Sequence, residues 1–152
     1  MSLVRCTVMG RTCTHTLSAS ESILDNLATV VNSQAGCVRF SAYAMGSNLH
    51  QPYRSVQVAP NPSLFVSRSF GQPGYAQLRS DADSQIVVPG ATGGTCSSPV
   101  VTDAQTILAG AQNGSEMGVY CRENVPLKRR GLALKFEEFA PIGQLPVWID
   151  VD

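Results

Sequence analysis

The first part of the chain alternates short apolar stretches with small polar residues. Between residues 4 and 43, β-branched, aromatic and other apolar residues occur in short groups separated by Gly, Asn and Ser. Short groups of this kind, bounded by turn-forming residues, are typical of β-strands. The apolar positions lack the 3.6-residue period of an amphipathic helix. We therefore predict that this region consists of short strands.

Short strands at near-regular spacing fit a barrel, a sandwich or a parallel β-solenoid. In a solenoid each strand stacks on its equivalent one coil away, and the inward side chains form ladders. The apolar residues that we expect in such ladders include Val8, Ile23, Val30 and Val38. The spacing is too irregular to define a repeat, so the pattern alone leaves the three architectures open.

Residues 44–122 form a loop-rich β region by composition. Prolines and glycines between residues 46 and 74 interrupt it, and proline has no N–H to donate within a central strand. We expect a strand over 64–70, a loop over 89–94, and a strand or short helix over 98–108.

One helix is predicted near the C-terminus. Asn124 can cap it, and Pro126 occupies the first turn, where a missing N–H is tolerated. An apolar stripe at i, i+4 and i+7 is formed by Leu132, Phe136 and Phe139. Pro141 ends the helix, and residues 147–149 are predicted to form a last strand. Leu132, Leu134 and Phe136 also alternate as in a strand, which is the alternative for this segment.

Length and charge limit the functional classes. The 152 residues fit one domain, and eleven basic residues balance eleven acidic ones. A nucleic-acid partner would require a basic excess, so we expect none. No apolar run approaches the roughly 20 residues that span a bilayer, so we expect no membrane insertion. The N-terminal residues lack signal-peptide features, which predicts a cytoplasmic protein, either free or incorporated in an exported particle.

Cysteine chemistry gives weak signals. The five cysteines are Cys6, Cys13, Cys37, Cys96 and Cys121. An odd count without a CxxC pair favours reduced thiols, and cysteines in apolar strands are usually buried. The spacing of Cys6, Cys13 and His15 matches no standard zinc site, so we predict no metal and no cofactor.

Two groups of residues are candidates for catalysis. Cys96 follows two glycines whose amides could form an oxyanion hole, but a thiolate needs a base and only His15 and His50 are available. Parallel β-helices that act on carbohydrate use clustered carboxylates. The carboxylate candidates are Glu21, Asp25, Asp81 and Asp83. Glu21 and Asp25 share a face only if the strand between them is straight. We treat both groups as weak candidates and favour a protein without enzymatic activity.

Several sequence blocks resemble one uncharacterised bacterial family. The blocks are CTVMG (6–10), SESIL (20–24), GCVRFS (36–41), FGQPGY (70–75), GSEMG (114–118) and the segment 132–143. They occur in the same order and cover most of the chain, except residues 91–112. The resemblance implies a right-handed parallel β-helix, encoded near loci for contractile phage-tail-like particles. It implies no catalytic residues.

These observations predict a single domain over 1–152, with short-strand coils over 4–43, the loop-rich region over 44–122 and a helix and last strand over 123–152. The expected fold is mainly β, a parallel β-helix with a C-terminal helix and capping segment; the alternative is a sandwich or barrel. The expected function is a structural or interaction module of a larger phage-tail-like assembly. A β-helix that begins near Val4 exposes an unpaired edge, which either a partner chain or a further region of a longer protein would cover. We therefore expect a homo-oligomer or larger assembly, or a fragment of a longer protein. The alternative function is a carbohydrate-active lyase or hydrolase, with carbohydrate as the partner.

Overall fold

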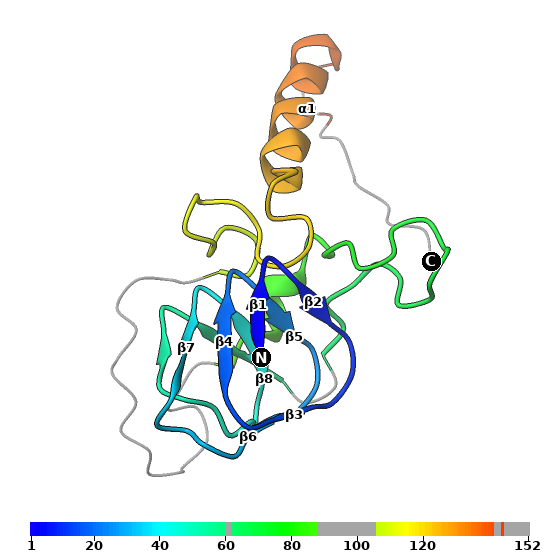
Figure 1. Ribbon diagram of the computed structural model, residues 1–152. Coiled ribbons are helices and arrows are strands. Elements are labelled where there is room, and N and C mark those ends of the chain that lie inside the picture. Colours follow the sequence, from blue (N-terminus) through cyan, green and yellow to red (C-terminus); the bar gives the residue numbers. More distant parts are fainter. Residues whose placement is uncertain (60–61, 88–105, 142–143, 145–152) are drawn as a thin grey trace.

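The chain folds as a parallel β-solenoid with a C-terminal helix (Figure 1). The computed structural model describes residues 1–59, 62–87, 106–141 and 144. The strands are β1 (Ser2–Val4), β2 (Thr7–Val8), β3 (Thr12–Thr14), β4 (Leu17–Ser20), β5 (Ile23–Leu24), β6 (Ala28–Val30), β7 (Gly36–Arg39), β8 (Ala42–Ala44), β9 (Pro52–Tyr53) and β10 (Val56–Val58). The 3₁₀ helix is η1 (Ala82–Gln85) and the α-helix is α1 (Val125–Phe139).

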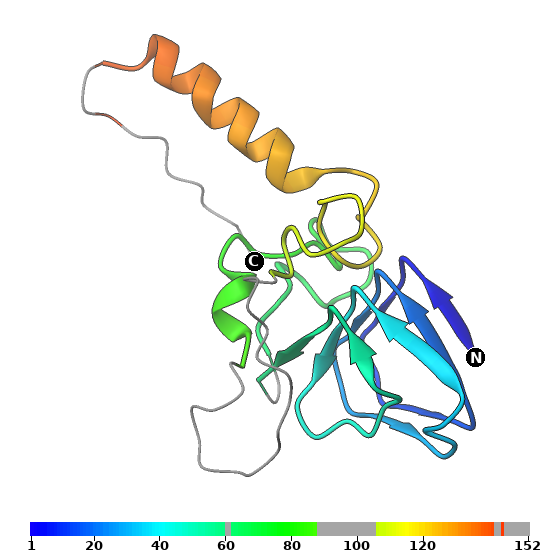
Figure 2. The same ribbon diagram turned by 90° about the vertical axis from the view of Figure 1, so that its left-hand side faces the viewer.

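Three parallel sheets run along the solenoid. Their strand orders are β1-β4-β7-β9, β2-β5-β8-β10 and β3-β6. Asn48 continues the third sheet through a single parallel bridge to Thr29. Figure 2 shows the coils side by side, with the first coil in dark blue at one end of the stack. The prediction of a parallel β-helix is confirmed.

The coils differ in length. Ser18 lies beside Ser2, Gly36 beside Leu17, and Pro52 beside Val38, so each step along the stack contains a different number of residues. This irregularity explains why the sequence shows no fixed period.

One corner of the solenoid repeats in every coil. Arg5, Glu21, Phe40 and Arg54 each follow a strand of the first sheet, and all four have positive φ, between 45° and 54°. A left-handed residue is uncommon outside glycine and bends the chain sharply. Here it turns the chain from the first sheet into the second.

Serines stabilise this corner. The amide of Ser22 donates to Oγ of Ser41 and the amide of Ser41 donates to Oγ of Ser55, both at 3.2 Å. Each of these hydroxyls in turn donates to the carbonyl two residues earlier, at 2.7–3.0 Å. Cys6 occupies this position in the first coil, and its amide donates to Oγ of Ser22 at 3.2 Å. The ladder therefore pairs backbone amides that the strands leave unpaired at the corner.

The interior of the solenoid is apolar. Its buried residues are Leu17, Ala19, Leu24, Ala28, Val30 and Val38, with Leu3, Val8, Tyr43 and Leu49 packed against them. Val8, Val30 and Val38 thus lie in the predicted internal ladders. Burial of each Leu or Val side chain in this core stabilises the fold by about 1.5–3 kcal/mol.

A second core lies outside the second sheet. Residues 62–87 and 106–121, here called the second layer, cover the outward face of β5, β8 and β10. Ile23 packs in this outer core with Leu64, Ile107 and Met117. The prediction that Ile23 belongs to the internal ladders is therefore wrong, because successive strand residues point to opposite faces and Leu24 is the inward one.

The second layer is mostly irregular. The strand predicted over 64–70 is replaced by two isolated bridges, from Phe65 to Leu78 and from Ser67 to Tyr75. Ile86 forms an antiparallel bridge with Val58 of β10. The loop over 89–94 and most of the segment 98–108 lie outside the described residues.

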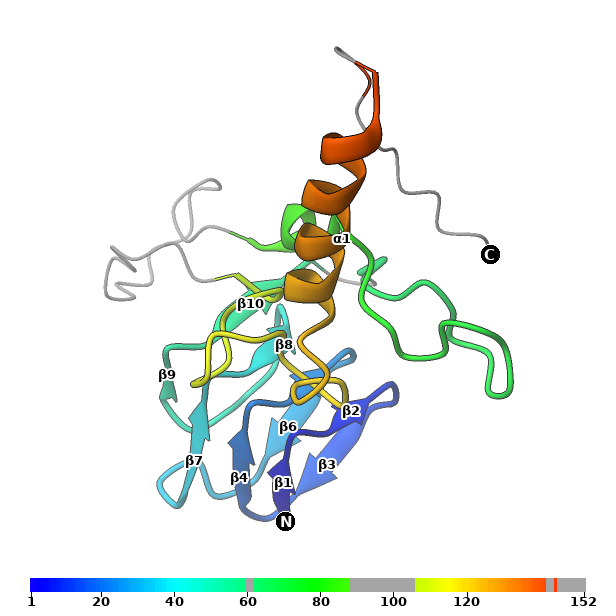
Figure 3. The same cartoon turned by 90° about the horizontal axis from the view of Figure 1, so that it is seen from above.

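Helix α1 projects from the body of the protein (Figures 1 and 3). The prediction of this helix is confirmed, and Ala140, just before Pro141, is extended. Asn124 stands at the N-cap but makes no side-chain capping bond, because its backbone is left-handed (φ 51°) rather than extended. The stripe of Leu132, Phe136 and Phe139 is exposed, with Phe139 at 86%. The predicted strand over 147–149 lies outside the described residues.

Candidate functional sites

Glu21 joins the solenoid to the second layer. Its carboxylate accepts a hydrogen bond from Nε of Arg5 at 2.7 Å and one from the backbone amide of Gln112 at 3.1 Å. The hydrogen bond and the negative charge of Glu21 raise the pKa of Arg5. The side chain of Glu21 is buried although it is charged, and its partners compensate for the lost hydration.

Asp25 lies under the second layer. Nη2 of Arg68 donates to its Oδ1 at 2.6 Å and to the carbonyl of Pro62 at 2.8 Å. Burial raises the pKa of Asp25, and the charge of Arg68 opposes that shift. Glu21 has a left-handed backbone between β4 and β5, so the straight strand that would align it with Asp25 does not form. The two carboxylates have separate partners.

The other two carboxylate candidates stabilise turns. Asp81 is exposed, and its pKa is lowered by the hydrogen bond from Arg79, whose Nε lies 2.9 Å away. Asp83, in η1, accepts the backbone amides of Ile107 at 2.6 Å and Leu108 at 3.3 Å. Each of the four predicted carboxylates therefore binds a different structural partner.

The cysteines and histidines are dispersed. Cys96 lies outside the described residues. Cys121 is buried and Cys6 is half-buried, but Cys13 and Cys37 are exposed because their side chains point outward from β3 and β7. The expectation that strand cysteines are buried is wrong for these two. His15 is exposed, whereas Nδ1 of His50 lies 2.6 Å from the carbonyl of Ser33. Across the described ranges, no three His, Cys, Asp or Glu side chains gather as a metal site.

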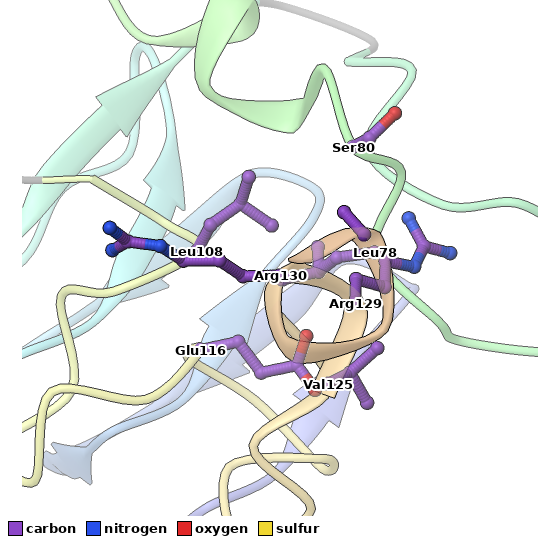
Figure 4. Close-up of a pocket in the computed structure, with 8 residues that line it drawn as sticks. Leu78, Ser80, Leu108, Glu116, Val125, Arg129 and Arg130 are labelled. Atoms are coloured by element: carbon purple, nitrogen blue, oxygen red, sulfur yellow. The ribbon is translucent and has the colours of Figure 1, made fainter. Parts of the chain in front are cut away.

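A pocket of about 210 Å³ lies between the second layer and the start of α1 (Figure 4). Its lining is mostly apolar and includes Leu78, Leu108 and Val125. Glu116 also lines it, with only 1% of the residue exposed. No motif in the sequence identifies Glu116 as a candidate; it lies within the block GSEMG (114–118) of the family resemblance.

The first coil has an open edge, defined here as the side of β1, β2 and β3 that faces away from the second coil. Each of these strands stands last in its sheet among the strands that the structure describes. Ser18 donates to the carbonyl of Met1 and Arg5 donates to that of Ser20, so backbone groups at odd positions of β1 face β4. By alternation, the amides of Ser2 and Val4 face outward.

The same alternation applies to the other two strands of this coil. The carbonyls of Cys6 and Val8 accept amides of the second coil, which leaves the amide of Thr7 facing outward. The amide of Thr12 and the carbonyl of Thr14 bind the second coil, which leaves the amide of Cys13 outward. The open edge thus presents, from all three sheets, backbone amides that no other residue in the described ranges pairs.

None of the helices in the described ranges has the length and apolarity needed to cross a membrane. Comparisons with protein-family models, with curated protein sequences and with solved structures find no match to this chain.

Proposed function

We propose that this protein is a structural or interaction module without enzymatic activity, which assembles through the open edge of its first coil. The observation that carries the proposal is the outward row of backbone amides from Ser2, Val4, Thr7 and Cys13. A strand edge of this kind is a template for pairing with another chain.

The partner that we propose is a second copy of the same chain. Two copies related by a two-fold axis place β1 of one antiparallel to β1 of the other. The outward backbone groups of each copy then pair with those of its partner. Val4 supports this arrangement because it is apolar and 57% exposed beside the edge. Pairing would bury its side chain together with the outward amides.

The opposite end of the solenoid is covered at its second sheet and ends in a short strand at its first, which favours a dimer over a filament. Beside β10, the amide of Ala59 donates to the carbonyl of Gln85 and the amide of Val87 donates to that of Gln57, both at 2.8 Å. In the first sheet, β9 has two residues and begins with Pro52, which has no N–H. Short strands and prolines are the usual means by which proteins block an edge.

A rigid dimer of solenoids agrees with what the family resemblance implies, a component of a phage-tail-like particle. We propose this larger assembly as the context of the module. The contacts of the carboxylates favour a structural role for Glu21, Asp25, Asp81 and Asp83 over a carbohydrate-active site.

Light scattering after size exclusion, over a concentration series, tests the proposal. The edge variant S2K/V4K places two lysines beside the outward amides, where they oppose pairing. The control variant S84K/V31K makes the same two exchanges at exposed positions outside the first coil. We expect a dimer for the unmodified protein and the control, and a monomer for the edge variant. A monomer at every concentration, or an edge variant that still dimerises, would contradict the proposal.

A further inference from the structure

Oε1 of Glu116 is a buried hydrogen-bond acceptor to which no residue in the described ranges donates, although the charge of Arg129 acts on the carboxylate. This oxygen is inaccessible to solvent. Figure 4 shows the side chain directed toward the start of α1, where Val125 lies. Leaving a buried polar group unpaired costs about 1–3 kcal/mol, and more for a charged one. Such a group therefore indicates a missing partner.

The pocket beside Glu116 can hold that partner. Its volume of about 210 Å³ exceeds that of apolar cavities of roughly 150 Å³ that bind a benzene ring. A buried water needs two to four polar partners, and most of this lining is apolar. The pocket is therefore better suited to a molecule with an apolar body than to water alone.

Charge narrows the class of molecule further. Arg129 lines the pocket and its charge acts on Glu116, so a cation would meet a positive charge beside the carboxylate. An anion would approach the carboxylate of Glu116 at low dielectric. An uncharged molecule avoids both penalties, provided that it donates a hydrogen bond to Glu116.

We propose that the pocket between residues 78–80, Leu108 and α1 binds a small uncharged molecule with an apolar ring or chain and one hydroxyl, which donates its hydrogen bond to Glu116. The apolar part would pack on Leu78, Leu108, Val125 and Ala133. This site is independent of the open edge, which is formed by other residues at the first coil.

Burial raises the pKa of Glu116 to about 7, with the charge of Arg129 lowering it and that of Glu123 raising it. At pH 8.5 the carboxylate is therefore ionised and only accepts hydrogen bonds. This condition separates ligands that donate from ligands that only accept.

Two probes of nearly the same shape test the site at pH 8.5. Cyclohexanol donates a hydrogen bond, whereas cyclohexanone only accepts. Titration of the full chain is followed by ¹H–¹⁵N spectra, through the amides of Glu116, Met117 and Ala133. We expect cyclohexanol to shift these amides and to bind about tenfold more tightly than cyclohexanone, as a hydrogen bond to a charged acceptor predicts.

Two variants confirm the role of Glu116. E116L removes the acceptor, and we expect both probes to bind it with equal affinity. E116Q keeps the shape and can both donate and accept, so we expect the preference for cyclohexanol to disappear while binding persists. Unchanged amide shifts in the solenoid show that each variant is folded. If E116L does not fold, the result for E116Q by itself tests the proposal. Equal affinities for the unmodified protein, no shifts at these amides, or a preference retained in E116Q would overturn the proposal.

Discussion

The amide of Ser22 donates a hydrogen bond to Oγ of Ser41, its equivalent one coil further along the solenoid, at 3.2 Å. The hydroxyl of Ser41 also donates to the carbonyl of Arg39 at 2.7 Å. The hydroxyl therefore accepts the amide of Ser22 and donates to a carbonyl that also accepts the backbone amide of Glu21 at 3.1 Å. Ser22 and Ser41 are both fully buried, so water does not replace these bonds.

Replacing Ser41 with alanine should destabilise the protein by about 1–3 kcal/mol, because the buried amide of Ser22 loses its acceptor. Ser18→Ala is the matched control, since Ser18 lies exposed in β4 and makes no side-chain bond that stabilises the corner. That change should alter stability by about 0.5 kcal/mol or less. Urea denaturation measures both, and equal midpoints would contradict the role of the ladder.

Contact between the second layer and the solenoid depends on Gly118. A Cβ at this position would lie 2.7 Å from Oγ1 of Thr7 and 2.8 Å from Cδ1 of Ile23. We expect Gly118→Ala to destabilise the fold by about 2–4 kcal/mol, from steric overlap together with its positive φ of 95°.

The control for this substitution is Gly114→Ala. Gly114 also has a positive φ, 74°, but a Cβ there would meet nothing within 4 Å. The backbone penalty is shared, at about 1–2 kcal/mol, so the difference between the two variants reports the contact alone. Equal losses in thermal unfolding would show that Gly118 does not touch the solenoid closely.

The ion pair of Asp25 and Arg68 predicts a non-additive pair of mutations. Arg68→Leu leaves the charge of Asp25 buried without its partner, which should cost about 3 kcal/mol at neutral pH. The double variant D25L/R68L removes both charges and should be more stable than R68L. A double-mutant cycle by urea denaturation measures the coupling, and a double variant that is less stable than R68L would contradict this account.

Acidification provides a second readout for R68L. Loss of Arg68 removes the charge that opposes the upward shift in the pKa of Asp25, so that pKa should rise further. A raised carboxyl pKa means that the folded state binds the proton more tightly, so stability increases as the pH falls. R68L should therefore recover part of its lost stability at acidic pH.

Glu116 makes the stability of the unmodified protein depend on pH. Its pKa is about 7 in the folded protein and 4.5 in the unfolded chain. The folded state holds more protons between these values, so stability decreases as the pH rises through this interval and is constant above it. The full decrease is about 3 kcal/mol, at roughly 1.4 kcal/mol for each pKa unit.

Glu116→Gln should remove this dependence and be more stable than the unmodified protein at pH 8. Glu123→Gln, an exposed carboxylate near the pocket, is the control and should leave most of the dependence in place. Chemical denaturation between pH 4 and pH 8 gives the two profiles. A Glu116→Gln profile that still decreases between pH 4.5 and pH 7 would contradict the shift.

The solenoid could be predicted from the sequence because short strands and small polar turns have a local signature. The register could not, because the coils differ in length and the corner has different side chains, Arg5, Glu21, Phe40 and Arg54, with one backbone shape. The serine two residues after the ends of β4, β7 and β9 becomes recognisable only once the coils are aligned. The corner serines are irregularly spaced in the sequence although their hydrogen bonds repeat from coil to coil.

The direction of Ile23 could not be predicted either. Alternation identifies the inward face of a strand when the other face is polar, but β5 is buried on both faces, by the interior and by the second layer. Glu116 gave no local signal because its pocket combines residues from three separate segments. Residues that come together only through the tertiary structure leave no spacing pattern in the sequence.

The most direct measurement of the proposed assembly is hydrogen exchange at the amides of Val4 and Cys13, followed by ¹H–¹⁵N spectra at low and high protein concentration. If two copies pair through the open edge, both amides exchange more slowly as the concentration rises. The exposed amide of Gln34, which lies outside the first coil and is bonded to Asn32 Oδ1 at 3.1 Å, should stay constant. Exchange at Val4 and Cys13 that is fast and independent of concentration would show that the edge stays open and would contradict the account.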